Sequence, residues 1–369
     1  MIDIVKPIEC TGCYGCVNVC PMNCISMEKD VEGFEYPKID YDECIECNIC
    51  EHKCPSLHFK NPNKEGSMPE VYAAWSLDED IRFNSTSGGI FSELAKEVLR
   101  NGGYVCGAKY NEQHMVEHCI IRKEEDLPKI RQSKYVQSQV GTVYSDIKNL
   151  LLENKRVLFC GTPCECAALI NVVGEKDDNL TVVDFVCRGV NSPEVYKRYL
   201  AKLEEEFGSK VSKVWFKNKT KGWNRFSTKV EFEDGQYYLK DRYSDLYMRG
   251  YIEANLYMRL CCSDCKYKSF PRVSDITLAD FWGIKLKDET KDTDKGTSLV
   301  MINSPKGLKL YNGIKNRIFD EEKSIEDTFR GNVCITTSAK PNEKKDDFIK
   351  HLDDMDIMEN IERFCKKRI

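Results

Sequence analysis

The chain has 369 residues, with 20 cysteines, a formal net charge of −5 and a hydrophobic share of 41%. This length favours two or three domains, and the acidic balance gives no global electrostatic basis for binding nucleic acid. No apolar run reaches the roughly 18 residues of a membrane-spanning helix, and the N-terminus lacks the apolar core of a secretory signal. The sequence thus predicts a cytoplasmic protein whose thiols bind metal rather than form disulfides.

The N-terminal segment contains one cysteine pattern twice. Each copy has the spacing C-x2-C-x2-C-x3-C followed by proline, and the second copy begins 34 positions after the first. The copies are Cys10, Cys13, Cys16 and Cys20, and then Cys44, Cys47, Cys50 and Cys54. In two-cluster ferredoxins the fourth cysteine of each copy binds the other cluster. We therefore expect one 4Fe-4S cluster on Cys10, Cys13, Cys16 and Cys54, and a second on Cys44, Cys47, Cys50 and Cys20.

Zinc is the alternative for this segment, but zinc sites usually present two separated CxxC pairs, which three tandem cysteines fit poorly. The ninth cysteine, Cys24, is expected to be a small buried hydrophobe. Residues 34–40 alternate as a short strand does. Residues 61–67 are polar and rich in helix and strand breakers, which predicts a linker. The ferredoxin-type domain is therefore expected to span residues 1–66.

From residue 70 onward, strand and helix signals alternate. The fold class expected for the whole chain is therefore α+β, with a mixed α/β domain over residues 70–369 following the small ferredoxin-like module. Within that domain we expect an N-terminal part over residues 70–150 and a C-terminal part over residues 151–330, followed by a tail. Residues 71–75 favour a strand. A predicted helix then begins after the turn Ser85-Thr86-Ser87-Gly88-Gly89. Such a turn at a helix N-terminus can bind an anion such as a flavin pyrophosphate, and a capped core helix without ligand is the alternative. No Rossmann or P-loop motif occurs.

The middle of the chain predicts a strand–helix–strand unit. Residues 104–108 and 115–120 first favour a hairpin. Residues 156–160 then favour a strand, Cys164 begins a helix, and residues 180–187 favour another strand. The two strands should pair in parallel, which places Cys164 and Cys187 at the sheet edge where open α/β sheets bind ligands.

A CxxC pair lies far downstream of this unit, at Cys262 and Cys265. Our hypothesis is that Cys164, Cys187, Cys262 and Cys265 hold a third 4Fe-4S cluster. Zinc on the same four thiolates, or no metal, are the alternatives. The rival ligands are Cys160, Cys166 and Cys261.

Three further segments have weaker signals. Residues 230–239 predict a hairpin with an Asp-Gly turn. Residues 213–225 mix basic and aromatic side chains, and we favour a solvated strand face or a pocket for an anionic redox partner over nucleic-acid binding. Residues 331–369 are expected to form a peripheral helical tail. Cys334 and Cys365 are predicted to be structural.

At this point the sequence resembles the coenzyme F420 hydrogenase/dehydrogenase beta-subunit family, which also includes chlorophyll-pathway reductases. The residues that carry the resemblance are Ser85-Thr86-Ser87-Gly88-Gly89, Ser133-Lys134-Tyr135-Val136-Gln137-Ser138, Phe159–Cys164, Asp184–Gly189, Cys262 with Cys265, and Asp275–Gly283. The resemblance implies FAD bound without a Rossmann fold and one 4Fe-4S cluster on Cys164, Cys187, Cys262 and Cys265. The flavin contacts that it implies are ten residues of the first two segments: Ser85, Thr86, Ser87, Gly88, Gly89, Ser133, Lys134, Tyr135, Gln137 and Ser138. Arg188 stands where many members have histidine, and Cys261 is an additional thiol.

These inferences predict a flavin- and iron–sulfur-dependent oxidoreductase. Electrons would move between a hydride donor or organic substrate at FAD, such as F420, and a ferredoxin or another one-electron carrier through the clusters. Lys134 and Trp223 are expected near the flavin or substrate. The alternative is a non-catalytic iron–sulfur subunit that transfers electrons to a partner enzyme. The substrate and the direction of electron flow are left open by the sequence.

Overall fold

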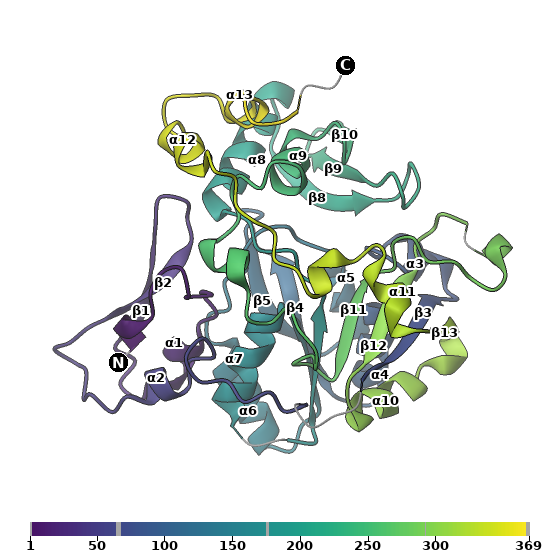
Figure 1. Ribbon diagram of the computed structural model, residues 1–369, viewed down its shortest axis with the longest axis horizontal. Coiled ribbons are helices and arrows are strands. Elements are labelled where there is room, and N and C mark those ends of the chain that lie inside the picture. Colours follow the sequence, from purple (N-terminus) through teal and green to yellow (C-terminus); the bar gives the residue numbers. More distant parts are fainter. Residues whose placement is uncertain (1, 64–67, 175–176, 292, 367–369) are drawn as a thin grey trace.

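The computed structural model describes residues 2–63, 68–174, 177–291 and 293–366. Figure 1 shows a small N-terminal module (purple) beside a large sheet flanked by helices, and a smaller sheet with its own helices above the large one. Residues 64–67 of the predicted linker and 367–369 of the predicted tail lie outside the described residues. Within the described residues, no helix combines the length and apolar character needed to cross a membrane.

The N-terminal module repeats its backbone conformation as well as its cysteines. Its elements are η1 (Ile2–Ile4), α1 (Gly15–Val19), β1 (Ile25–Lys29), β2 (Glu35–Ile39) and α2 (Ile49–His52). Strands β1 and β2 are antiparallel, which confirms the strand predicted over residues 34–40. Each short helix follows a residue in the left-handed conformation, Tyr14 (φ 62°) and Asn48 (φ 58°). These two residues occupy equivalent positions of the repeat.

The large sheet has eight strands in the described part of the chain, in the order β13-β3-β12-β11-β7-β6-β4-β5. The strands are β3 (Glu70–Ser76), β4 (Tyr104–Tyr110), β5 (Val116–Ile121), β6 (Val157–Gly161), β7 (Leu180–Phe185), β11 (Ile276–Asp280), β12 (Ser298–Ile302) and β13 (Ile318–Lys323). Strands β11, β7, β6 and β4 run parallel, and the outer pairs are antiparallel. The mixed α/β fold, the β4–β5 hairpin and the parallel β6–β7 pair are therefore confirmed.

Helices cover both faces of this sheet because its buried strands are apolar on both sides. In β6, Leu158 packs into the cluster around α4 (Ile90–Arg100), while Val157 and Phe159 pack against α6 (Val143–Leu152) and α7 (Pro163–Val173). This alternation follows the two-residue period of a strand. The remaining elements around the sheet are α3 (Glu79–Phe83), η2 (Glu124–Asp126), α5 (Leu127–Ile130), η3 (Leu260–Asp264), η4 (Glu289–Lys291), α10 (Pro305–Asn312), η5 (Lys315–Arg317), α11 (Ile325–Phe329) and η6 (Val333–Ile335).

The smaller sheet has the order β10-β9-β8, and its buried residues share one hydrophobic cluster with four helices that lie around it in Figure 1. Its strands are β8 (Val211–Asn218), β9 (Ser227–Phe232) and β10 (Tyr237–Asp241), and its helices are α8 (Pro193–Phe207), α9 (Leu246–Ile252), α12 (Lys345–Lys350) and α13 (Ile357–Glu362). The β9–β10 pairing confirms the hairpin predicted with an Asp-Gly turn.

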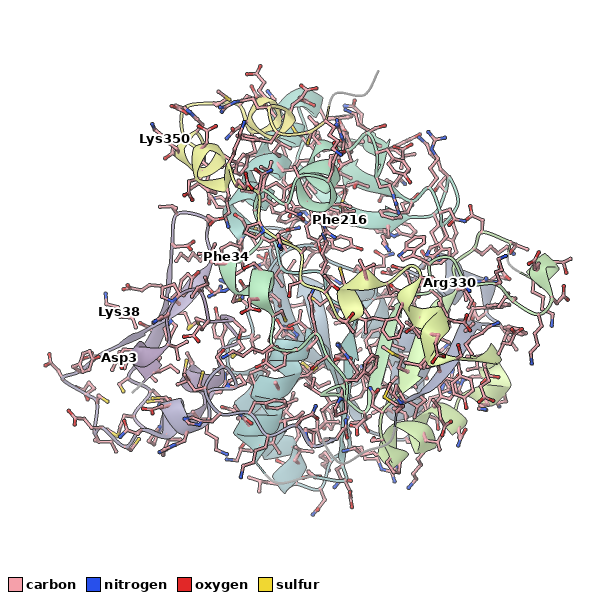
Figure 2. All side chains as sticks on the ribbon, in the orientation of Figure 1. Asp3, Phe34, Lys38, Phe216, Arg330 and Lys350 are labelled. Carbon is pink, nitrogen blue, oxygen red and sulfur yellow. The ribbon has the colours of Figure 1, made fainter. Side chains whose placement is uncertain are left out.

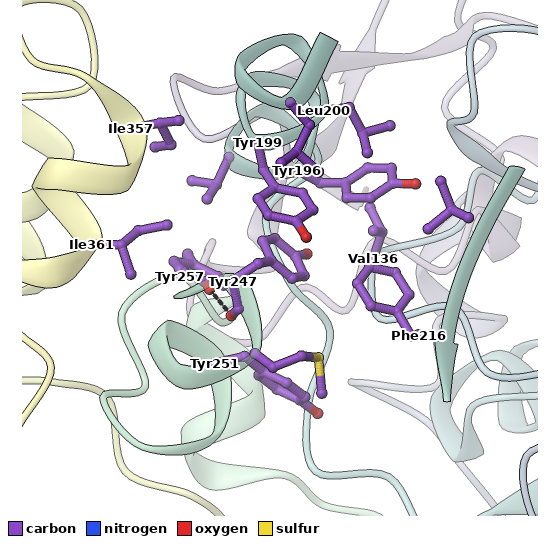
Figure 3. Packing of buried hydrophobic residues seen from close by; sticks show 14 of the residues in the cluster. Val136, Tyr196, Tyr199, Leu200, Phe216, Tyr247, Tyr251, Tyr257, Ile357 and Ile361 are labelled. Atoms are coloured by element: carbon purple, nitrogen blue, oxygen red, sulfur yellow. Dashed lines mark hydrogen bonds between the residues drawn. The ribbon is translucent and has the colours of Figure 1, made fainter. Parts of the chain in front are cut away.

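The C-terminal tail is not peripheral, contrary to the prediction. Phe348 and Ile361 are fully buried, and Cys365 packs into the same cluster. Figure 3 shows Ile357 and Ile361 facing the tyrosine-rich core of the smaller sheet. The charged residues of the tail hid this role, because its apolar side chains are few and widely spaced.

The N-terminal module shares a hydrophobic cluster with the large domain. Tyr14 and Val19 of the module pack with residues of α7. In Figure 2, Phe34 lies toward the rest of the molecule and Lys38 away from it. The described end of the predicted linker is also anchored, since Asn63 is buried and its amide donates to the carbonyls of Arg272 (3.0 Å) and Ser274 (2.8 Å).

Candidate functional site

The structure brings Cys10, Cys13, Cys16 and Cys54 together at the inner side of the N-terminal module. Burial, and then the charges of the other three cysteines, raise the pKa of the Cys16 thiol well above its usual range. A metal centre bound by these four cysteines as thiolates would offset this cost. The grouping is the one expected from the crossed ligand pattern of two-cluster ferredoxins.

The second set, Cys20, Cys44, Cys47 and Cys50, lines a small hollow at the outer side of the module. Cys47 is exposed to solvent. Cys24 is buried, as predicted, but it is not simply a core residue, because it lines the same hollow and its Sγ lies 3.4 Å from the Sγ of Cys20.

The third set is assembled from three distant segments at the carboxyl ends of the parallel strands. Cys164 lies in the first turn of α7, Cys187 follows β7, and Cys262 and Cys265 lie in and just after η3. After burial, the charges of Cys262 and Cys265 raise the pKa of Cys187. The charges of Cys265 and Cys187 likewise help to raise the pKa of Cys164, after burial and the charge of Glu165. The four cysteines that the sequence grouped are therefore neighbours.

Local chemistry fixes the position of Cys164. Thr162 and Glu165 form a reciprocal capping box at the start of α7, and the Thr162 hydroxyl lies 3.1 Å from the Cys164 Sγ. Capping of this kind satisfies the free backbone donors of a helix N-terminus. The start of the helix, and with it the thiol, is thereby held in one place.

Two of the rival cysteines, Cys166 and Cys160, are engaged elsewhere, whereas Cys261 lies beside the third set. Cys166 is fully buried, and its thiol bonds to the carbonyls of Gly161 (3.7 Å) and Val183 (3.6 Å). Cys160 lines the neighbouring cavity. Cys261 is buried beside Cys262, and a hydrogen bond from Cys261 is the main cause that lowers the pKa of Cys262 to about 7.

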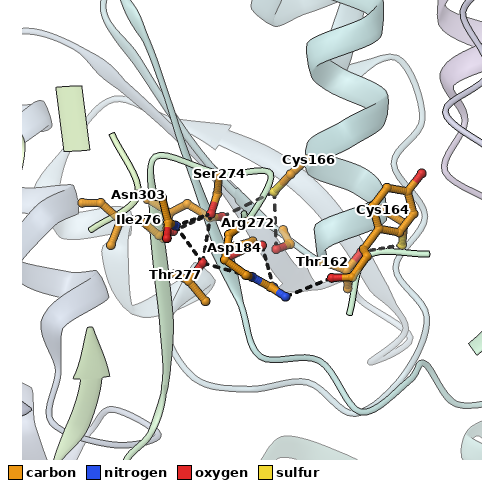
Figure 4. A network of polar contacts seen from close by, with 12 residues as sticks. Thr162, Cys164, Cys166, Asp184, Arg272, Ser274, Ile276, Thr277 and Asn303 are labelled. Carbon is orange, nitrogen blue, oxygen red and sulfur yellow. Dashed lines mark hydrogen bonds and ion pairs between the residues drawn. The ribbon is translucent and has the colours of Figure 1, made fainter. Parts of the chain in front are cut away.

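A buried polar network lies beside the third set. Arg272 forms an ion pair with Asp184 (2.8 Å), and the two side chains are 2% and 0% exposed. Arg272 also donates to the carbonyl of Tyr267. Figure 4 shows this network beside Thr162 and Cys164. The network ties β7 to the segment that carries Cys265.

A cavity of about 730 Å³ opens next to the third set, and Cys187 is part of its wall. Of the ten residues that the resemblance assigned to flavin contacts, eight line this cavity: Ser85, Thr86, Ser87, Gly89, Ser133, Lys134, Tyr135 and Ser138. The Thr86 hydroxyl accepts from the backbone N–H of Ser133 (2.7 Å), so the two predicted segments meet in one wall.

Gly88 and Gln137 are the two exceptions. Gly88 is packed so tightly that an added Cβ would lie 2.4 Å from the Ala74 carbonyl oxygen. The amide of Gln137 points to the N-terminal module and donates to the Thr11 carbonyl (3.1 Å). Gln137 therefore faces away from the cavity that Ser138 lines.

Lys134 and His118 are titratable side chains of the cavity wall whose pKa values are lowered. Burial lowers the pKa of Lys134 to about 8. Burial also lowers the pKa of His118, whose Nδ1 lies 2.8 Å from the Ser138 hydroxyl. The His118 Nε2 has no hydrogen-bond partner among the described residues. The wall therefore offers polar groups that a ligand could satisfy.

The basic and aromatic segment at 213–225 is exposed at its two ends, at Lys213 and at Lys221 and Arg225, and buried between them. Lys213 is exposed, but Lys217 and Lys219 are buried. Although burial opposes it, the charge of Asp280 raises the pKa of Lys217. Lys219 donates to the Ser87 carbonyl (2.8 Å) and so holds the glycine-rich turn in place.

Two other predicted positions need comment. Trp223 does not line the cavity itself but stacks on Trp282, which does, at a ring distance of 4.2 Å. Cys334 was predicted to be structural, yet it lines the cavity. An isolated cysteine gave no sequence signal for this position, since only the packing of η6 over the sheet edge brings it there.

The fold and the duplicated cysteine loops define the class of protein: a ferredoxin-type module joined to a mixed α/β domain. Residues 9–57 match the 4Fe-4S dicluster domain. Residues 71–145 and 154–328 match the N-terminal and C-terminal parts of the coenzyme F420 hydrogenase/dehydrogenase beta subunit. The chain belongs to this beta-subunit family and carries an N-terminal dicluster domain.

Relatives of known name are distant. The chain is 23% identical over 175 residues to a subunit of the F420H2 dehydrogenase of Methanosarcina mazei, an alignment that covers 45% of this chain and 49% of that one. The chain thus spans about half the length of that relative. Ferredoxin-1 of Caulobacter vibrioides is 42% identical over 48 residues, 12% of this chain and 38% of its own length.

A solved structure, the F420-reducing [NiFe] hydrogenase complex of Methanosarcina barkeri, contains a chain with 18% identity and a TM-score of 0.47. That match covers 82% of this chain and 93% of the other.

Proposed function

We propose that this chain is the iron–sulfur electron-transfer subunit of an F420-linked redox complex. Three 4Fe-4S clusters would be held by Cys10, Cys13, Cys16 and Cys54 (cluster one), by Cys20, Cys44, Cys47 and Cys50 (cluster two), and by Cys164, Cys187, Cys262 and Cys265 (cluster three). Residues 1–66 would form the dicluster domain and residues 70–369 the larger domain. When bound, such clusters supply one-electron chemistry.

The observation that carries this proposal is the way residues 259–267 dock. This segment holds Cys262 and Cys265, and both of its ends contact the backbone beside cluster one. At one end the Arg259 guanidinium donates to the Cys10 carbonyl (2.9 Å). At the other the Tyr267 hydroxyl donates to the Pro55 carbonyl (3.1 Å). The cysteine sets of clusters one and three are therefore directly adjacent.

The Tyr267 ring marks the space between these two sets. After burial, the charges of Cys164, Cys13, Cys265 and Cys54 raise the pKa of its hydroxyl. Two of these cysteines belong to cluster one and two to cluster three. Water is excluded from this contact, because Tyr267 is only 6% exposed and packs against Phe59.

The outer end of the series is suited to a protein partner. Around the exposed Cys47, the side chains of Tyr41 and Ile45 are 54% and 60% exposed. Exposed acids, Asp42, Glu43 and Glu46, lie among them. Apolar surface with a charged rim is typical of protein contacts. A ferredoxin or another one-electron carrier with a basic rim would dock here.

The test of this function is the cofactor content of anaerobically purified protein. We expect about twelve iron atoms per chain, that is, three clusters of four. We also expect a reduced ferredoxin to reduce all three clusters, which electron paramagnetic resonance would follow. A content of about eight iron atoms would contradict the third cluster. Three clusters that a ferredoxin-level donor fails to reduce would contradict the electron-transfer role.

A flavin oxidoreductase is the second candidate, and the cavity favours it. A volume of about 730 Å³ lies within the usual range for small-molecule and cofactor sites. Eight predicted flavin contacts line the cavity, and Lys134 supplies a cationic donor when protonated. FAD would supply hydride chemistry there, with F420 or another organic molecule as the substrate.

Absorbance separates the two candidates. Flavin bands together with about twelve iron atoms would support the flavin enzyme, and the same iron without flavin after titration with FAD would support the electron-transfer subunit. Lys134→Met should weaken FAD binding at pH 7, whereas Lys213→Met, on the exposed start of β8, should leave it unchanged.

A further inference from the structure

Arg259 is a buried cation whose hydrogen-bond partners are all neutral. Its side chain is 1% exposed. The guanidinium donates to the carbonyls of Cys10 (2.9 Å) and Glu35 (2.9 Å) and to the side-chain oxygen of Gln137 (2.8 Å). No carboxylate forms an ion pair with it within the described ranges of the chain. A buried charge without a counter-ion is expensive, so an anionic group is needed nearby.

The nearby groups that can be anionic are cysteines of two different sets. The Arg259 guanidinium donates directly to the carbonyl of Cys10. Arg259 is also the residue just before η3, which carries Cys261 and Cys262. Cys10 belongs to cluster one and Cys262 to cluster three. The backbone also joins Arg259 to Cys262, since the Cys262 N–H donates to the Arg259 carbonyl (3.0 Å).

The duplicated cysteine loops show that the first loop is adapted to this arginine. Gly12 and Glu46 occupy equivalent positions of the repeat and share a left-handed conformation, with φ of 64° and 54°. Because Glu46 adopts this conformation, the backbone alone does not demand glycine at residue 12. A Cβ on Gly12 would lie 2.7 Å from the Arg259 guanidinium nitrogen. The missing side chain makes room for the arginine.

We propose that Arg259 is the shared counter-charge of clusters one and three, and that it raises the reduction potential of both while leaving cluster two unaffected. The proposal rests on the proposed function, because it requires cluster three. Four thiolates make such a cluster anionic, and each one-electron reduction adds a negative charge without breaking or forming a bond. A fixed cation close by stabilises the reduced state. Electrons come from the external one-electron carrier.

Arg259→Gln tests this directly in the full-length protein. We expect the potentials of clusters one and three to fall together in a redox titration followed by electron paramagnetic resonance. The expected shift is about tenfold in each reduction equilibrium constant, or about 59 mV for a one-electron couple. Cluster two is the internal reference. A purely structural role for Arg259 would not move two potentials in one direction.

Lys268→Gln is the matched control for a charge that is not shared. Its backbone N–H donates to the Cys265 carbonyl (3.4 Å), and its amine donates to the carbonyl of Arg188, the residue after Cys187 (3.1 Å). Removing it should lower the potential of cluster three alone. Arg259→Lys, which keeps the charge, should change both potentials much less than Arg259→Gln.

Gln137→Glu provides a second variant if Arg259→Gln does not fold. The Gln137 side-chain oxygen lies 2.8 Å from a guanidinium nitrogen of Arg259. A carboxylate at this position would offset the positive charge of the arginine. Both potentials should again fall. Unchanged potentials in a variant with all three clusters, or a shift of cluster three alone, would overturn the role of Arg259. A wild-type protein with two clusters would instead overturn the proposed function.

Discussion

Each cysteine set of the N-terminal module and the third cysteine set bring four thiols together, but the sequence separation between those thiols differs. In the module, three of four thiols of each set come from one loop of seven residues, such as Cys10 to Cys16. In the third set, the thiols come from α7, from the end of β7 and from η3, and Cys164 and Cys265 lie about a hundred residues apart. The first arrangement needs only local backbone geometry, whereas the second exists only when the sheet is folded.

The largest expected effect is the loss of one cluster without loss of the other two. Cys262→Ser should reduce the iron content from about twelve to about eight atoms per chain, because it removes a ligand that the module does not supply. Iron and sulfide assays on anaerobic protein measure this. Cys261→Ser is the matched control and should retain about twelve iron atoms. The same loss in both variants would show that the ligand set is wrong.

Next in size is the dependence of the third set on a buried ion pair. Arg272→Met leaves the carboxylate of Asp184 buried and unpaired, which should cost about 3–5 kcal/mol of unfolding free energy. A denaturant titration measures it. The control, Lys295→Met, breaks the exposed pair with Glu79 (52% and 63% exposed) and should cost at most about 1 kcal/mol. Equal costs would contradict the supporting role of Arg272.

The lowered pKa of Lys134, in the cavity wall, should make the free energy of unfolding depend on pH. Burial lowers the pKa of Lys134 from its ordinary value of 10.5 to about 8 in the folded chain. Between these values the unfolded chain binds more protons, so stability should rise with pH, by up to about 1.4 kcal/mol per pH unit. Lys134→Met should lack this rise when unfolding is measured between pH 7 and 10.5. A parallel pH profile for the variant and wild type would contradict the shift.

The smallest expected effects are the stability changes on replacing two glycines of the first cysteine loop, Gly12 and Gly15, by alanine. Gly12→Ala is strained and meets Arg259 at 2.7 Å, so it should cost about 1–3 kcal/mol. An alanine Cβ at Gly15 would meet Ala168, Cys13 and Pro55 at ordinary distances of 3.6–3.9 Å. Gly15→Ala should therefore stabilise the helix by about 0.4–1 kcal/mol. Thermal unfolding of both variants compares them, and equal changes would mean that Arg259 does not constrain the first loop.

Much of the fold was predictable because its signals are short-range. The alternation of strands and helices gave the mixed α/β domain, and the β6–α7–β7 unit followed from one turn and two apolar runs. The position of Cys164 beside Cys187 followed from the parallel pairing of the two strands, whose carboxyl ends meet at one sheet edge. The tail from α12 onward was misjudged, since its burial depends on a surface formed by α8 and α9.

The cysteine spacing by itself predicted the two N-terminal cluster sites, because three of the four ligands of each site lie in one loop of seven residues. Local backbone geometry is enough to bring those three thiols together. Only the tertiary structure decided what lies between those sites and the larger domain. It turned Gln137 away from the cavity and placed Arg259 between two cysteine sets. It also brought Cys334 to the cavity wall. Contacts between residues this far apart leave no periodicity or spacing in the sequence, and they arise only from packing.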